Sequence, residues 1–77
     1  MSKPSIKHTR VALAANVRLF REKIGWTQEQ AADAIGIATR HYQKIEAGDV
    51  NVTLETLCHL AEAFEVSLRD LFEERGA

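Results

Sequence analysis

The stretch GWTQEQAADAIGIATRHYQKIEAG, residues 25–48, decides the fold that we predict for this 77-residue chain. Thr27 and Gln30 have the spacing of a capping box, in which each side chain bonds the backbone N–H of the other residue. A helix is therefore expected to begin at this point. Gly36 suits the left-handed backbone position just past the end of that short helix.

A second short helix is expected directly after Gly36, from Ala38 or Thr39 to Ala47, with Gly48 closing it. Two short helices joined by a short turn that contains glycine are the structural signature of a DNA-binding helix-turn-helix. Small and apolar residues stand where the two helices must pack on each other: Ala31, Ala32, Ile35, Ile37, Tyr42 and Ile45.

The helix Thr39–Ala47 is predicted to be the recognition helix, because its outward face is polar. On a wheel of about 100° per residue, Arg40, Gln43 and Lys44 fall opposite the packed side, and Thr39 lies on the flank. Long donor side chains of this kind match base edges in the major groove of DNA. An ordinary solvent-exposed helix face would also be polar. The helix and glycine turn that precede this face favour the interpretation that these four residues contact DNA bases.

The rest of the chain predicts three more helices, which gives an all-α, five-helix fold. One helix is expected from about Thr9 to Gly25, and Thr53 is expected to cap another. Ser67 and Asp70 form a second capping box, which opens a short last helix. Apolar stripes mark the buried faces of these helices: Leu13, Val17, Phe20 and Ile24, then Leu54, Leu57, Cys58, Ala61 and Phe64, then Leu68, Leu71 and Phe72. Residues 1–8 are predicted to be a flexible basic arm and residues 9–77 a single domain.

Charge is distributed unevenly along the chain. Residues 1–26 carry a net charge of +5, residues 27–47 carry −1 and residues 48–77 carry −5, so the chain as a whole is at −1. A polyanion could meet the basic end while the acidic end faces away from it. We therefore expect DNA phosphates to be contacted by Lys7, Arg10 and Arg18.

Other function classes find little support in the sequence. Cys58 is the single cysteine, so no internal disulfide can form, which suits the cytoplasm. His8, His41 and His59 do not combine with Cys58 in any metal-ligand spacing. No glycine-rich phosphate loop or triad-like set points to an enzyme. We expect no metal, cofactor, small-molecule ligand or membrane segment, and a cytoplasmic protein.

The chain resembles the Cro/phage-repressor helix-turn-helix family from about Leu13 to Phe72. Residues 51–57, NVTLETL, are similar to the controller proteins of restriction–modification systems. The motifs that carry the family resemblance are Val17-Arg18, Arg21, residues 25–29, Ala32, Gly36-Ile37, residues 45–48 and residues 66–72. The chain departs from the family at Ala31, Ala38 and Glu65, none of which faces DNA.

The resemblance implies a lambda-repressor-like fold, operator binding and frequent homodimers. It also implies a largely buried salt bridge between Arg21 and Glu46, and a contact of Gln28 with the DNA backbone. Gln28 stands near a helix N-terminus, where free N–H groups favour anions. His41, beside the recognition face, is a further candidate for a phosphate contact.

The predicted function is that of a sequence-specific transcriptional regulator that binds a palindromic operator in double-stranded DNA as a homodimer. The apolar patch Leu68, Leu71 and Phe72 is the expected dimer interface, since the monomer core needs only part of it. If all three residues pack internally, the protein is a monomer. An antitoxin-like or other helical protein-interaction module is the alternative function.

Overall fold

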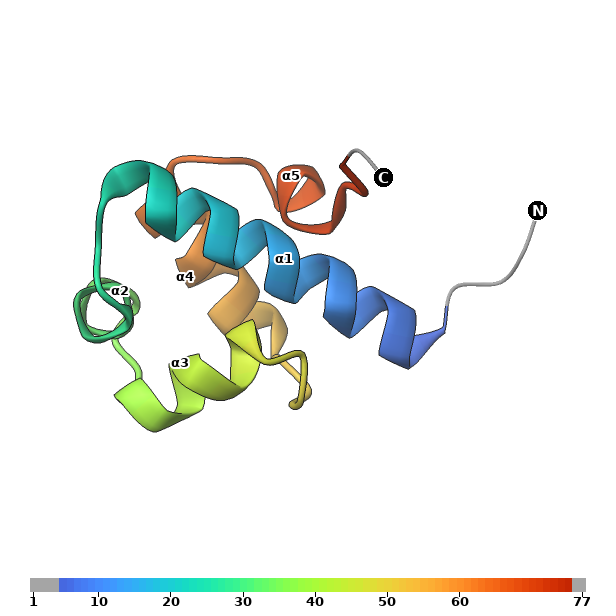
Figure 1. Ribbon diagram of the computed structural model, residues 1–77, viewed down its shortest axis with the longest axis horizontal. Helices are drawn as coiled ribbons and strands as arrows, with labels where there is room; N and C mark the ends of the chain where they lie inside the picture. The colour runs from blue at the N-terminus through green and yellow to red at the C-terminus, as the bar shows by residue number, and fades with distance from the viewer. Residues whose placement is uncertain (1–4, 76–77) are drawn as a thin grey trace.

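Five α-helices form the part of the chain that the computed structural model describes, residues 5–75. They are α1 Ile6–Ile24, α2 Gln28–Ile35, α3 Thr39–Glu46, α4 Leu54–Phe64 and α5 Leu68–Phe72. Figure 1 shows the long α1 running across the molecule, with α2 and α3 at one side and α4 and α5 against α1. The expected all-α, five-helix architecture is confirmed.

The first helix begins three residues earlier than the sequence predicts. Ser5 is its N-cap, and the Ser5 hydroxyl accepts a hydrogen bond from the backbone N–H of His8 at 3.0 Å. Lys7 and His8 therefore lie on a helix rather than in a flexible arm. Residues 1–4, the rest of the predicted arm, lie outside the described residues. The helix ends at Gly25, whose φ of 88° is readily adopted by glycine.

The two helices of the predicted helix-turn-helix follow their local signals closely. Thr27 and Gln30 form both hydrogen bonds of the capping box, at 3.0 and 2.8 Å. Gly36 ends α2 in the left-handed conformation, with φ 85°. Ala38 is the N-cap of α3 and offers no side chain to cap it, so α3 begins at Thr39 without that stabilisation.

The last two helices also begin at predicted caps. Thr53 caps α4, and Ser67 and Asp70 form the capping box of α5. The one positive φ at a non-glycine residue among residues 5–75 is that of Glu65, at 57°, just after α4. A side chain at this φ carries a conformational cost that glycine avoids, so the departure of Glu65 from the family pattern costs some stability at this turn.

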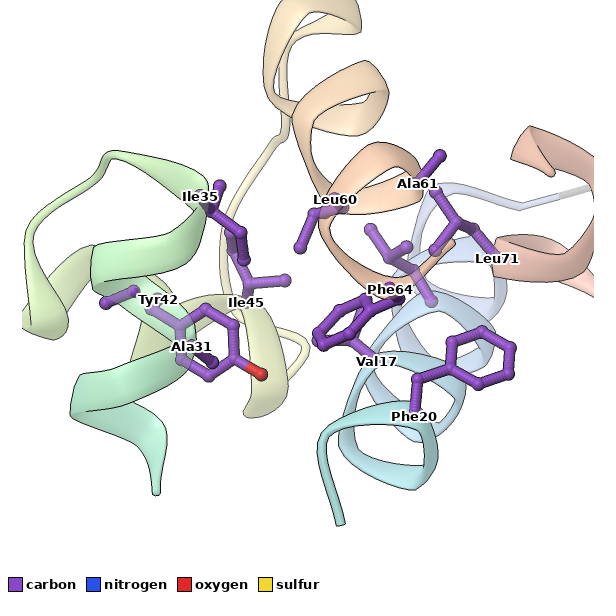
Figure 2. Packing of buried hydrophobic residues seen from close by; sticks show 12 residues of the cluster. Val17, Phe20, Ala31, Ile35, Tyr42, Ile45, Leu60, Ala61, Phe64 and Leu71 are labelled. Atoms are coloured by element: carbon purple, nitrogen blue, oxygen red, sulfur yellow. The ribbon is translucent and has the colours of Figure 1, made fainter. Parts of the chain in front are cut away.

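The core lies between α1 on one side and α2, α3 and α4 on the other, with α5 closing one end (Figure 2). Its largest fully buried side chains are Val17, Tyr42, Ile45, Leu60 and Leu71. Trp26 packs at its edge with its ring 6.1 Å from that of Phe64. The five largest fully buried side chains come from α1, α3, α4 and α5. The buried residues of α2 are Ala31, Ala32 and Ile35.

Three residues that the sequence predicts on the buried faces of α1 and α4 are exposed. Leu54, at the first position of α4, is 78% exposed. Ile24 is 45% exposed, because it stands in the last turn of α1, one residue before the cap. Cys58 is also exposed. The buried face of α4 centres on Leu60, Ala61 and Phe64, and Cys58 lies roughly 110° away from that centre on the helix. The prediction that Cys58 is a core residue is therefore wrong.

Candidate nucleic-acid interface

A buried ionic network holds α3, the predicted recognition helix, in place. Arg21 of α1 donates from Nε to Glu46 Oε2 at 2.6 Å and from Nη2 to Glu46 Oε1 at 3.2 Å. The two side chains are only 13% and 3% exposed. The structure thus brings together the two residues that the family resemblance pairs. The Arg21 guanidinium also donates to the Trp26 carbonyl at 2.8 Å, which ties the α1–α2 turn to the same network.

Two further side chains donate to the Glu46 carboxylate. The Tyr42 hydroxyl bonds Oε2, and the Gln28 amide bonds Oε1 at 3.1 Å. Burial alone would raise the pKa of Glu46, but the hydrogen bonds from Arg21, Tyr42 and Gln28 outweigh it and hold that pKa below its ordinary value. Burial, with the bond to Glu46, raises the pKa of the Tyr42 hydroxyl well above its usual range. Glu46 is therefore a charged anchor at neutral pH.

The outward face of α3 is free of the core. Arg40, Gln43 and Lys44 are exposed, and Thr39 and His41 are half-buried. Gln43 donates from Nε2 to the Gln28 side-chain oxygen at 3.2 Å. Gln28 therefore links Glu46 to Gln43, so the start of α2 positions a side chain on the exposed face of α3. Sequence reasoning placed Gln28 at a phosphate and missed this link, for which no local signal exists.

The predicted phosphate contacts on α1 share one side of that helix. Lys7, Arg10 and Arg18 fall within about 80° of one another on a helical wheel. The same side meets α3, because Arg21 bonds Glu46 and the backbone of Arg10 lies close to Gly48. Lys7 and Arg18 are exposed, and Arg18 also lies 3.5 Å from Glu22. The basic side of α1 thus flanks α3.

Arg10 differs from the other two basic residues. It is half-buried, and its Nη2 donates to the Asn51 side-chain oxygen, which joins α1 to the segment between α3 and α4. Its Nε is buried with no acceptor among the described residues. Arg10 is thus partly engaged within the protein, unlike the exposed Lys7 and Arg18.

The predicted dimer patch is divided by the fold. Leu71 is fully buried and points into the core (Figure 2), so it cannot contact a partner. Leu68 is 44% exposed and Phe72 is half-buried. The core takes Leu71, and Phe72 packs against its edge.

Asn16 is a buried polar residue that the sequence analysis did not single out. Its amide donates to the carbonyls of Leu71 and Glu73, at 3.0 and 2.7 Å, and its oxygen accepts from Arg75 at 2.6 Å. The Arg75 guanidinium lies 5.1 Å from the centroid of the Phe20 ring. Asn16 therefore fastens α5 and the residues after it to the middle of α1.

Neither a metal centre nor a membrane segment stands out. Within residues 5–75, no three or more His, Cys, Asp or Glu side chains gather as they would around a metal ion. The helices over the same range are too short or too polar to cross a membrane.

Comparison with known proteins identifies the family. The helix-turn-helix family HTH_3 matches residues 17–71. The chain belongs to this family. It is 43% identical over 51 residues to the cryptic phage CTXphi transcriptional repressor RstR of Vibrio cholerae, covering 66% of this chain and 46% of that protein. It is 38% identical over 64 residues to the control protein C.SmaI of Serratia marcescens, covering 83% of this chain and 76% of that protein.

Solved structures agree with this assignment. The hypothetical transcription factor NHTF from Neisseria superposes with a TM-score of 0.82 at 31% identity, covering 92% of this chain and 80% of that one. The restriction–modification controller protein C.AhdI from Aeromonas hydrophila gives 0.78 at 30% identity, covering 82% and 96%. The predicted resemblance to phage repressors and restriction–modification controllers is confirmed. These relatives are named as regulators rather than enzymes, and this chain spans under half the length of RstR.

Proposed function

We propose that this protein is a sequence-specific transcriptional regulator that inserts α3 into the major groove of double-stranded DNA. One observation carries the proposal. The exposed face of α3 presents Arg40, Gln43 and Lys44, while the buried side chain of Glu46 on its flank anchors the helix to α1 through Arg21. A recognition helix needs both properties, because base contacts require donors held at a fixed position and orientation.

The base contacts that we propose are Thr39, Arg40, Gln43 and Lys44. Thr39 stands in the first turn of α3, where groove contacts concentrate in helix-turn-helix proteins. The bond between Gln43 and Gln28 leaves the Gln43 oxygen free to accept a hydrogen bond from a base. Arg40 suits the O6 and N7 acceptors of guanine.

The phosphate contacts that we propose are Gln28, Lys7, Arg10, Arg18 and His41. Three of these residues stand on the basic side of α1, next to α3, so they can reach the strands that border the groove. Gln28 opens α2, where backbone N–H groups also favour an anion. Phosphate contacts position the protein, and the face of α3 reads the sequence.

A homodimer on a palindromic operator completes the proposal. A domain of this size reads one half-site, and two copies about one helical turn apart give the specific affinity that a regulator needs. The proposal rests on the size of the domain and on the single recognition helix among residues 5–75.

Selection of bound sequences from a random pool of DNA duplexes tests the function directly. We expect enrichment of one sequence with two-fold symmetry. Enrichment of nothing would contradict the proposal and favour a helical protein-interaction module, such as an antitoxin-like protein.

The roles of individual residues are tested on the selected duplex. Arg40→Ala is expected to weaken specific binding by about 1–3 kcal/mol and to relax preference at one base position. Arg18→Gln should instead weaken binding to all sequences and reduce the salt slope by about 1. Arg69→Ala, on the exposed surface of α5, is the matched control and should change neither property. An unchanged sequence preference in Arg40→Ala would assign Arg40 to the phosphate contacts.

A further inference from the structure

An apolar groove lies beside the surface of the proposed DNA contacts and shares with them only Arg10. It has a volume of about 350 Å³ and runs between the first half of α1 and the segment that joins α3 to α4. Its apolar lining comprises Ile6, Leu13, Val50, Val52, Leu57 and Phe72. Phe72, the half-buried member of the predicted dimer patch, thus belongs to this groove.

An apolar side chain protrudes beside the groove. Leu54 is 78% exposed, the highest value among the exposed large hydrophobic residues in the described part of the chain. It stands one helical turn before Leu57, which lines the groove, so the two residues are neighbours on the same side of α4. Cys58, one turn after Leu54, is exposed on the same side. A protruding leucine and an apolar groove therefore adjoin on one surface.

Opposite charges accompany these two features. Arg10 lines the groove and is half-buried, so it places a positive charge at the groove. Glu55 follows Leu54 and is exposed. A partner that fits this surface must offer an apolar side chain for the groove and a carboxylate near Arg10. The surface around Leu54 offers both.

We propose that this surface is the contact between two copies of the chain, each placing Leu54 in the groove of its partner and Glu55 near the partner's Arg10. A two-fold contact requires a surface that complements itself, and a groove, a knob and opposite charges side by side meet that requirement. The inference rests on the homodimer proposed above and names its surface. It moves the interface from the patch on α5 to α4 and the groove.

Sedimentation velocity without DNA tests the surface. We expect the parent protein to dimerise at tens of micromolar and Leu54→Asp to weaken the dimer by at least about tenfold. Leu68→Asp is the matched control, because it places the same charge at an exposed leucine of α5. We expect Leu68→Asp to dimerise as the parent does. Circular dichroism should show unchanged helix content in both variants, since both positions are exposed.

Three outcomes would overturn the inference: a monomeric parent, a Leu54→Asp variant that dimerises normally, or a dimer that is broken by Leu68→Asp alone. A parent that selects a DNA sequence but stays monomeric overturns this inference and leaves the proposed DNA binding intact. A parent that dimerises but selects no DNA sequence overturns the proposed DNA binding and leaves this inference intact.

A charge exchange tests how the two copies are arranged. Arg10→Glu and Glu55→Arg should each weaken the dimer, because each places like charges across the contact. The double variant should recover most of the lost affinity, since it restores opposite charges with their positions swapped. Losses that simply add in the double variant would overturn the proposed arrangement.

Discussion

The two halves of α1 are fastened to the rest of the molecule by different chemistry. Near its C-terminal end, Arg21 meets a Glu46 carboxylate that is 3% exposed. Nearer its start, His8 meets Glu74, and these two side chains are 64% and 69% exposed. Between them, the neutral amide of Asn16 bonds two carbonyl groups of the C-terminal segment.

This difference predicts how much stability each region loses when its contact is removed. A buried charge that loses its partner stays out of water unpaired, whereas an exposed one returns to the solvent. The proposed recognition helix α3 is therefore held by the contact whose loss costs most. The end of α5 and the residues after it depend on the hydrogen bonds of Asn16, an uncharged side chain, and on the exposed contact between His8 and Glu74.

The largest effect is expected from removing one partner of the buried pair. Arg21→Leu should destabilise the protein by about 3–5 kcal/mol, because it leaves Glu46 buried without its counter-ion. Urea unfolding measures this loss. Arg21→Leu with Glu46→Leu should cost less than the two single changes together. Additive losses would mean that the pair does not act as a unit.

A smaller loss is expected from Asn16→Ala. It leaves the carbonyl groups of Leu71 and Glu73 without a donor and removes an acceptor from Arg75, at a cost of about 1–3 kcal/mol. Amide hydrogen exchange should quicken in α5 more than in α3. Equal protection of α5 in variant and parent would show that Asn16 does not fasten this end.

Acid should weaken the recognition end through Glu46. The folded-state pKa of Glu46 lies below its ordinary value, so the carboxylate stabilises the fold above the unfolded-state pKa of about 4.3. That contribution is lost as the pH falls through the folded-state pKa. Burial raises the pKa of Glu46 and the hydrogen bonds lower it, so the net lowering is the difference between these two contributions. Glu46→Gln should flatten the decline of stability with acid, as measured by urea unfolding from pH 6 to about 2.5.

The smallest effect is expected at the exposed pair. His8→Ala should change the stability by less than about 1 kcal/mol, because both side chains of the contact are exposed. Thermal unfolding of the variant and the parent checks this. A loss as large as that of Asn16→Ala would mean that the exposed contact contributes as much stability as the buried amide.

Some of the sequence predictions failed where packing rather than local pattern decides. The stripe on α4 includes Cys58, yet the other helices cover the side that holds Leu60 and Phe64. Leu71 and Leu68 share one apolar patch in the sequence, but only Leu71 enters the core. An apolar stripe on a helix is wider than the face that its neighbours cover, so its edges cannot be assigned from spacing alone.

The sequence by itself determined where α2, α4 and α5 begin, where α1 and α2 end, and which face of α3 is polar. A cap is a contact between residues three apart, and a left-handed glycine is a property of one residue, so both are encoded locally. Only the tertiary structure decided that Gln28 joins Glu46 to Gln43, that Asn16 fastens α5, and that Leu54 adjoins an apolar groove. Most of these contacts join residues that are far apart in the chain. Leu54 and Leu57 are close in sequence, but the groove beside them exists only because α1 forms its other wall. The packing of distant helices therefore decides them.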